Sequence, residues 1–329
     1  MGKRHCAMDD WLLLGLVAIC LIATNGIAIA QNYPVKPVRL IVAFPPGGPN
    51  DLIARIISPK LADHINQPVI VENRAGAGGV IATEAVIRTA PDGYTLLFNS
   101  NGALAIGPLL SKVSYDVRRD LAPIARIASN PMLLVAHPNV RAQTVREIVT
   151  FAKANPGKLN FASAGSGSPT HLAIELLQSM AGVRFVHIPY KGGGPAMADL
   201  IGGQVDYYFG GLTTALPHVK NGKLRAIALT SATRSGVAPD IPTIGEGGLS
   251  GYDASIWYGI LAPAGTPREI LQLLHDAIIR VMRAPDIRTR LVEQGADTHE
   301  DGPEVFASLI AEESAKWARI INQAGIKAE

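Results

Sequence analysis

The sequence predicts an α/β fold of two domains, each a mostly parallel sheet flanked by helices. Three observations lead to this prediction. The chain of 329 residues is long enough for two domains of ordinary size. Beyond residue 31, short runs rich in β-branched residues alternate with segments of helical period, which is typical of parallel, buried sheets. No long Gly/Ser-rich or charged linker separates two halves, so short crossings must join the domains.

The first thirty residues have the pattern of a signal peptide. Lys3 and Arg4 provide a positive start, an apolar run follows from Trp11, and Ala28-Ile29-Ala30 forms a small-residue cleavage site. The alternative is an uncleaved membrane anchor, because the segment 11–30 approaches spanning length. No stop-transfer charges follow it, however. We therefore expect export to the periplasm with cleavage after about Ala30.

Both cysteines of the chain, Cys6 and Cys20, lie inside this segment. The mature protein would therefore contain no thiol, which excludes disulfides, cysteine nucleophiles and metal–thiolate sites. An exported protein without cysteine suits an oxidising bacterial periplasm.

Charge and histidine placement exclude further classes. The net charge of +3 is small and the Lys and Arg residues are scattered, so no nucleic-acid partner is expected. The eight histidines are dispersed and none form a metal-binding motif. His137 and His187 fall at strand ends, where structural histidines are common. We expect neither a metal site nor a cofactor.

The elements follow in order along the chain. Strands are expected at Val38–Ala43, Val69–Glu72, Thr95–Phe98, Met132–Ala136, Asn160–Ala162, Phe185–Ile188, Val205–Phe209, Ala226–Leu229 and Tyr258–Leu261. Helices are expected between most of them, at Leu52–Ile65, Ile81–Thr89, Val145–Asn155, His171–Ala181 and Ala196–Ile201. The C-terminal part predicts three consecutive helices, 268–283, 285–294 and 303–325, each started by proline or a polar cap.

Two crossings between the domains are expected, near Leu134–Ala136 and Leu229–Ser231. The first domain would then consist of residues 31–134 and 230–329, and the second of residues 135–229. Because the chain crosses twice, the C-terminal helices complete the first domain. This is a cleft-and-hinge layout.

The first candidate site is a glycine-rich loop between a strand and a helix. A glycine pair lets the backbone pass close to a ligand, and the Asn50/Asp51 cap signal leaves free N–H groups at a helix N-terminus, which favours an anion. The alternative is a tight turn that needs glycine only for its shape. The candidate residues of this loop are Phe44, Pro46, Gly47, Gly48, Asn50 and Asp51.

A second loop of this kind runs from Ser163 to His171. Ser168 is the expected N-cap and Pro169 the first-turn residue, so His171 falls in the first helical turn. The loop could accept a carboxylate or could serve for capping alone. A serine nucleophile would need G-x-S-x-G, and the outer glycines are missing here. The candidate residues are Ala164, Gly165, Ser166, Ser168 and His171.

Two further loops follow strand ends. Tyr190-Lys191 precedes three glycines and a proline that opens a short helix; Tyr190 could form a pocket wall, and Lys191 either screens an anion or is a surface charge. Ser100-Asn101 is a polar loop at the carboxyl end of a strand, where ligands bind in open α/β sheets, or a simple turn.

Asp206 lies in a strand with a buried pattern. A buried carboxylate is costly unless it is paired, so Asp206 is either a structural hydrogen-bond acceptor or an acceptor on the ligand side.

Taken together, these motifs resemble the periplasmic receptors of tripartite tricarboxylate transporters, also known as the Bug receptors. The resemblance covers essentially all of the mature chain. Its further motifs are Glu72-Asn73-Arg74-Ala75-Gly76-Ala77-Gly78-Gly79, Pro91-Asp92-Gly93-Tyr94-Thr95-Leu96, Ala154-Asn155-Pro156-Gly157-Lys158-Leu159, Val186-His187-Ile188-Pro189-Tyr190-Lys191-Gly192-Gly193, Gly203-Gln204-Val205-Asp206, Leu216-Pro217-His218-Val219-Lys220, Leu261-Ala262-Pro263-Ala264-Gly265-Thr266-Pro267 and the helix of Trp317.

The resemblance implies a two-domain periplasmic binding protein of type II that closes on its ligand like a flytrap. It also implies that backbone N–H groups and waters hold a ligand carboxylate at the first two loops, without an arginine clamp. Phe44 to Asp51 and Gly165 to His171 would inherit that role, and Ser100 and Asn101 would line the cleft. The implied partner is a membrane permease with a large and a small subunit.

The chain departs from the family pattern at Gly210. Relatives often place Asp-Asn or Asp-Ser there, where this chain has Gly210-Gly211. Our hypothesis is a pocket that is wider or less polar at the distal end of the ligand. An unchanged ligand preference in Gly210→Asp would contradict it.

The leading interpretation is a non-enzymatic receptor for a small organic carboxylate, with a monomer as the default state. A sensor subunit that presents its liganded state to a membrane kinase would use the same closed surface, and the neighbouring genes would distinguish it from a transport receptor. An exported hydrolase is the third alternative, and its loops offer only Ser166, Ser168 and His171.

Overall fold

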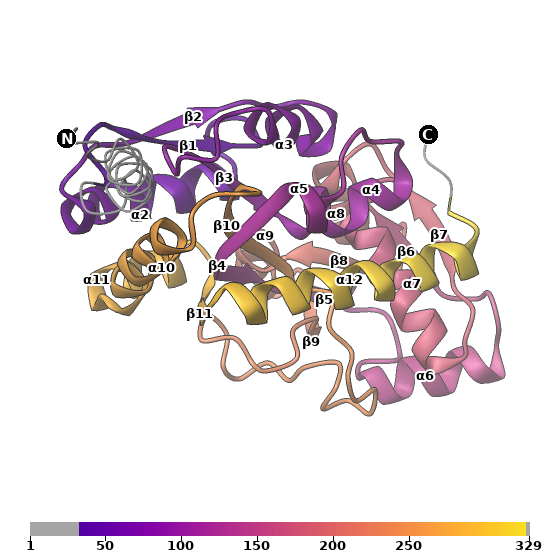
Figure 1. Cartoon of the computed structure of the whole chain (residues 1–329). Coiled ribbons are helices and arrows are strands. Elements are labelled where there is room, and N and C mark those ends of the chain that lie inside the picture. The colour runs from indigo at the N-terminus through magenta and orange to yellow at the C-terminus, as the bar shows by residue number, and fades with distance from the viewer. Residues whose placement is uncertain (1–32, 327–329) are drawn as a thin grey trace, which may run out of the picture.

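The computed structural model describes residues 33–326, so the predicted signal peptide lies outside the described part of the chain. The chain forms two β-sheets with helices on both faces of each, an α/β fold of two lobes (Figure 1). We refer to the lobe built on the six-stranded sheet as the first lobe and to the other as the second lobe.

The first lobe contains a sheet in the order β2-β1-β3-β10-β4-β11. Strands β2, β1 and β3 pair in parallel, as the alternation of strands and helices predicts. Strand β10 pairs antiparallel with both β3 and β4, and β11 pairs antiparallel with β4. The strands are β1 (Val38–Val42), β2 (Val69–Asn73), β3 (Thr95–Ser100), β4 (Leu121–Asn130), β10 (Ile256–Pro263) and β11 (Asp297–Asp301).

The second lobe contains a sheet in the order β7-β6-β8-β5-β9. Strands β7, β6 and β8 are parallel, whereas β5 is antiparallel to its neighbour β8. The strands are β5 (Met132–Ala136), β6 (Asn160–Ser163), β7 (Val186–Pro189), β8 (Tyr207–Gly211) and β9 (Arg225–Leu229).

Helices cover both faces of each sheet because each face is apolar. In the first lobe, α2 and α10 pack on one face, and α3 and α12 pack on the other. In the second lobe, α6 and α7 cover one face and α8 the other. The longer helices are α2 (Pro49–Ile65), α3 (Val80–Ile87), α6 (Val145–Ala154), α7 (Pro169–Ala181), α8 (Gly193–Ile201), α9 (Leu212–Lys220), α10 (Arg268–Arg283), α11 (Pro285–Glu293) and α12 (Pro303–Ala324), and the short ones are η2 (Ala77–Gly79), η3 (Gly102–Ile106), α4 (Gly107–Leu110) and α5 (Val117–Asp120).

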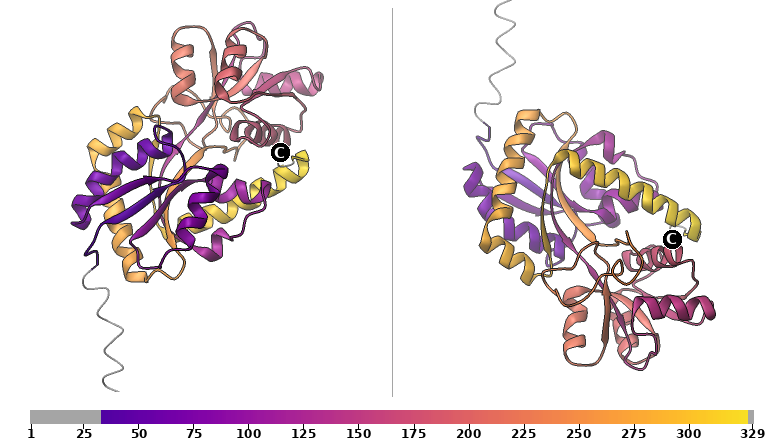
Figure 2. Two further views of the ribbon diagram at one scale, coloured as in Figure 1. Left: turned by 90° about the horizontal axis from the view of Figure 1, so that it is seen from above. Right: turned by 90° about the horizontal axis from the view of Figure 1, so that it is seen from below.

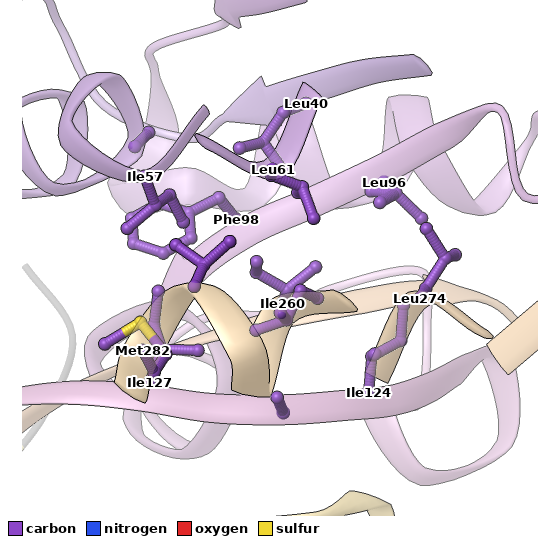
Figure 3. Packing of buried hydrophobic residues seen from close by; sticks show 14 of the residues in the cluster. Leu40, Ile57, Leu61, Leu96, Phe98, Ile124, Ile127, Ile260, Leu274 and Met282 are labelled. Carbon is purple, nitrogen blue, oxygen red and sulfur yellow. The ribbon is translucent and has the colours of Figure 1, made fainter. Parts of the chain in front are cut away.

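The core of the first lobe lies between its sheet and the helices α2 and α10 (Figure 3). Leu40 and Phe98 project from neighbouring strands toward Ile57 of α2, while Ile260 and Leu274 join strand β10 to helix α10. All five side chains are at most 1% exposed. Burial on this scale contributes roughly 1.5–3 kcal/mol for each large apolar side chain, which makes the lobe a rigid base for its loops.

The chain passes between the lobes at two places. It leaves the first sheet at Asn130 and enters the second at Met132, a few residues before the crossing expected near Leu134–Ala136. It returns through the long segment between β9 and β10. Within that segment Thr230 anchors the crossing, since its hydroxyl accepts a hydrogen bond from the Met132 N–H at 2.8 Å.

Helix α12 belongs to both lobes. Near its start, Phe306 and Ile310 pack in the first lobe, and near its end Trp317 and Ile320 pack in the core of the second. The two views of Figure 2 show the helix running from one lobe to the other beside the crossings. The C-terminal helix thus packs on the first lobe and also reaches the second.

The short helices η2, η3, α4 and α5 were not predicted, and neither were three longer elements, β4, β11 and α9. Strand β4 contains Pro123, and β11 has no apolar side chain at all, so neither has a strand pattern in sequence. Helix α9 contains Pro217 in its interior. These elements are held by their tertiary contacts rather than by local preference.

Candidate functional site

The predicted loops of the first lobe lie at one edge of its sheet. Because β1, β2 and β3 are parallel, the loops that follow Val42, Asn73 and Ser100 begin at the same edge. This edge carries the predicted residues 44–51 and 100–101.

Asp51 fastens the loop between β1 and α2. Its carboxylate accepts hydrogen bonds from the Gly47 N–H at 3.0 Å, Arg55 Nε at 2.9 Å and Asn73 Nδ2 at 2.9 Å. Asn73 Nδ2 also donates to the Phe44 carbonyl at 3.0 Å. Burial alone would raise the pKa of Asp51. The hydrogen bonds to its carboxylate lower the pKa by more than burial raises it, so the pKa lies below the ordinary value. Asp51 therefore organises the loop through contacts within the protein.

Helix α2 begins without a side-chain cap. Gly48 is the N-cap and Pro49 the first residue, so the helix starts before the predicted Asn50/Asp51 cap. Among residues 33–326, the N–H groups of Asn50 and Asp51 have no hydrogen-bond partner, and neither does the Asn50 Oδ1 atom, although Asn50 is buried. The loop residues Pro46 and Gly47 are exposed. The helix start thus keeps the free amides and positive dipole end that suit an anion.

The residues after β3 have two different roles. Asn101 Nδ2 donates to the Ser255 carbonyl at 2.9 Å and so joins the strand end to the returning segment. Asn99, which was not predicted, accepts from the Ser100 N–H at 2.9 Å and donates to Thr83 Oγ1 at 3.1 Å. The Ser100 hydroxyl, in contrast, has no partner within residues 33–326 and remains available.

In the second lobe, the loop before α7 is held by its own polar groups. Ser168 is the N-cap, as predicted, and its hydroxyl accepts from the His171 N–H at 3.3 Å. Ser168 Oγ also donates to the Gly165 carbonyl at 2.6 Å, and the Ala164 N–H donates to Thr170 Oγ1 at 2.8 Å. Ser166 lies exposed at the tip of this loop, and its N–H has no partner in the described part of the chain.

His171 stabilises the same loop. Its Nδ1 accepts from the Gly167 N–H at 3.0 Å, and its Nε2 lies 3.5 Å from Glu175 Oε1. Its ring stacks on that of His187. Both ring nitrogens therefore face protein groups, and neither contacts Ser166, the pairing that a hydrolase would require.

His187 was not predicted as part of the site. Its Nε2 lies 2.6 Å from Ser163 Oγ at the end of β6. Burial, followed by the charge of His171, lowers the pKa of His187 to about 4. No local sequence pattern marks it, because its partners come from another strand and another helix.

The loop after β7 lies beside the loop before α7. The Gly192 N–H donates to the Ala164 carbonyl at 3.1 Å. The Tyr190 hydroxyl donates to Asp199 Oδ2 at 2.7 Å, and burial together with this hydrogen bond raises the pKa of Tyr190. Lys191 is exposed and forms no ion pair within residues 33–326.

Asp206 has a structural partner. Its Oδ2 accepts from the Asn160 N–H at 2.7 Å, at the beginning of β6. This end of the strand is opposite to the end that carries Gly165. We therefore leave Asp206 out of the site proposed below.

Apolar atoms fill the space beside Gly210. A Cβ atom at this position would lie 3.0 Å from Met197 Cε, 3.3 Å from Ala215 Cβ and 3.3 Å from Tyr208 Cε1. The surroundings of Gly210 are apolar, which agrees with the less polar pocket in the hypothesis from the sequence. They leave no added room next to the backbone, which speaks against a wider pocket.

The loop edges of the two lobes touch. Leu110 of α4, which follows β3, places its Cδ1 3.3 Å from the position that a Cβ of Gly167 would take. The same segment divides its side chains between the lobes, since Leu104 packs in the first and Ile106 in the second. The segment that follows Ser100 and Asn101 is therefore a neighbour of the loop before α7 across the boundary between the lobes.

A family model described as "Tripartite tricarboxylate transporter family receptor" matches residues 53–326. The chain belongs to this receptor family. Protein BugT of Bordetella pertussis is 39% identical over 325 residues, which span 97% of this chain and 99% of BugT.

Two solved structures support the assignment of this chain to the receptor family. The structure of R. palustris Rpa4515 with adipate is 32% identical, has a TM-score of 0.73, and matches over 90% of this chain and 100% of that one. MatC from Rhodopseudomonas palustris with bound malate is 35% identical with a TM-score of 0.68, over 88% of this chain and 100% of that one. The fold of the receptor is therefore that of a two-domain periplasmic solute-binding protein.

Two kinds of feature are absent from residues 33–326 of the receptor. No group of three His, Cys, Asp or Glu side chains is arranged to hold a metal ion. None of the helices in this range combines the length and the apolar character needed to cross a membrane.

Proposed function

We propose that the receptor binds a small organic carboxylate between the loop edges of its two lobes and delivers it to a membrane permease with a large and a small subunit. The observation that carries this proposal is the uncapped start of α2. There, Asn50 and Asp51 offer free N–H groups behind the exposed turn at Gly47. An anion is the ligand that such a helix start favours.

The second lobe contributes the opposite wall. Ser166 is exposed, with a free N–H, at the tip of the loop before α7, and the contact between Leu110 and Gly167 brings this loop to the first lobe. The hydrogen bonds of Asp51 to Gly47 and of His171 to Gly167 hold the two loops in one conformation before a ligand binds. This preorganisation reduces the conformational entropy lost on binding.

The ligands of relatives agree with this chemistry. Rpa4515 was solved with adipate and MatC with malate, and both are carboxylates. We infer that a carboxylate bridging the lobes stabilises the closed state, with bending at the two crossings near Pro131 and Thr230. In this proposal the protein acts in the periplasm as a monomeric binding protein rather than an enzyme, after removal of residues 1–30.

The first test is mass spectrometry of the mature protein purified without refolding, under native and then denaturing conditions. A carboxylic acid released on denaturation would support the receptor function and identify its ligand class. The carboxylate assignment would be contradicted if the protein releases no ligand and if no carboxylate of a broad panel raises its melting temperature.

A matched glycine pair locates the binding loop. Gly47 and Gly157 both have a left-handed backbone, with φ of +82° and +69°, and both would place a Cβ in open space. Alanine at either position therefore carries a similar strain of about 1–2 kcal/mol. We expect Gly47→Ala to weaken ligand binding about tenfold or more and Gly157→Ala to leave it unchanged.

A further inference from the structure

The hydroxyl of Tyr208 has no partner although its side chain is buried. Tyr208 lies on β8 and is 4% exposed, with its ring beside Gly210. No hydrogen bond joins its hydroxyl to any other residue of the range 33–326. The neighbouring Tyr207 projects from the opposite face, and its hydroxyl donates to the Ala142 carbonyl at 2.7 Å. The hydroxyl oxygen itself is not fully enclosed, so it is free to donate a hydrogen bond to a ligand that reaches it.

This hydroxyl points at the start of helix α8. It lies 2.8 Å from the position that a Cβ of Gly193 would take, and Gly193 is the first residue of the helix. A side chain at Gly193 would therefore collide with the hydroxyl. The position is open to a ligand from the other side, since Cβ atoms at Gly192 or Gly194 would meet nothing within 4 Å.

The start of α8 also keeps its donors free. Gly192 is the N-cap and supplies no side-chain cap. Within the described chain, the N–H groups of Gly193 and Gly194 have no hydrogen-bond partner. Two free amides at the positive end of a helix dipole, beside the unpaired charge of Lys191, favour an anion over a neutral or cationic group.

We propose that the Tyr208 hydroxyl and the first N–H groups of α8 form an oxyanion site that takes a second carboxylate of the ligand. The inference rests on the proposed carboxylate receptor function. Burial raises the pKa of Tyr208, so its hydroxyl stays protonated and donates. The site is adjacent to the loop before α7, because the Gly192 N–H donates to the Ala164 carbonyl. The proposed oxyanion site thus lies beside the second-lobe wall at Ser166.

The test compares dicarboxylates with monocarboxylates of the same length. Succinate, glutarate and adipate are titrated by calorimetry alongside butanoate, pentanoate and hexanoate, into the wild-type protein, Tyr208→Phe and the control Tyr207→Phe. We expect the wild type to prefer at least one dicarboxylate over its monocarboxylate by about tenfold or more. Tyr208→Phe should remove most of that preference and leave monocarboxylate binding unchanged, and Tyr207→Phe should keep it.

Two outcomes of this titration would overturn the site. An unchanged preference in Tyr208→Phe would show that the hydroxyl does not contact the ligand. An equal loss for both members of each pair would show a general packing role for the ring.

A second arm separates the site from the proposed function. Sulfate is titrated into the 15N-labelled protein while the amide signals of Gly193 and Gly194 are followed. If no carboxylate binds the wild type, the receptor proposal fails. Saturable shifts of these amides that Tyr208→Phe weakens would even then support an oxyanion site, whereas amides that do not respond to sulfate would contradict it.

Discussion

The imidazole rings of His171 and His187 lie face to face, with their centroids 3.8 Å apart and their planes within 6° of parallel. The pair connects the first turn of α7 to strand β7, directly beneath the loop that carries Ser166. Two protonated rings at this distance would repel each other, and burial disfavours a charge on His187 as well. The loop therefore depends on His187 being neutral.

Stability should consequently fall as the pH drops from about 6.5 toward 4. The pKa of His187 is lowered from 6.5 to about 4, and that of His299 is lowered to about 4 by burial and then by Arg126. Between these values the unfolded chain binds protons that the folded chain does not, so acidification favours unfolding. Urea unfolding at pH steps between 7 and 4.5 measures the slope. His187→Gln should make the slope smaller and leave the part due to His299, and a wild-type stability that stays constant over this range would contradict the assignment.

Replacing Asp51 by asparagine should loosen the first loop. The substitution removes the negative charge that accepts from Gly47 and Arg55, and we expect a loss of about 1–3 kcal/mol in the free energy of unfolding together with weaker ligand binding. Asp286 is a suitable control, because it pairs with Lys60 at 2.5 Å but is 60% exposed. Asp286→Asn should cost less than about 1 kcal/mol. Equal losses in urea unfolding would argue against a fastening role for Asp51.

An aspartate at position 210 should destabilise the protein rather than simply restore a polar pocket. Its Cβ would press on the Met197 methyl and on Ala215, and crowding of this kind costs about 1–3 kcal/mol. The neighbouring Gly211 is exposed, and its Cβ would meet only Thr214 Oγ1, at 3.3 Å. Gly211→Asp is therefore the matched control. Melting temperatures that fall equally in both variants would refute this explanation.

Removal of the Trp317 side chain should weaken the joint between the lobes. Trp317 is 2% exposed, and its Nε1 donates to the buried Glu313 at 2.8 Å. Trp317→Ala would create a cavity and leave the carboxylate without this donor, so we expect a loss of about 3–5 kcal/mol. Arg319→Ala on the exposed face of the same helix should change stability by less than about 0.5 kcal/mol. Thermal unfolding of the two variants measures the difference.

The elements that the sequence predicts are those with local patterns. The capping serine Ser168 and the following Pro169 mark the start of α7, and the structure has both where the pattern places them. Strand β11 has no such pattern, because Asp297–Asp301 is entirely polar. Its place is fixed by distant partners, including the ion pair of Asp301 with Arg126 at 2.5 Å.

The loops of the candidate site were predictable, but the direction of their side chains was not. Their residue types suggested that Asp51 and His171 face a ligand. In the structure, Asp51 accepts a hydrogen bond from the Gly47 N–H and His171 accepts one from the Gly167 N–H, each within its own loop. Asn73 was quoted only as part of a motif, although it bonds from the end of strand β2 to Asp51 of helix α2. Such pairings depend on which strands are neighbours, and a single sequence contains no signal for them.

Helix α12 packs against both lobes, and this has a practical consequence for optical detection of ligand binding. The end of this helix packs with the second lobe through Trp317, so a fluorescent protein fused after the C-terminus would report on that lobe. Ile70 of β2 is 46% exposed on the first lobe. Residues 33–326 contain no cysteine, so Ile70→Cys would be the single attachment point for an acceptor dye in the mature protein. The receptor is thus suited to become a ratiometric sensor for its own ligand.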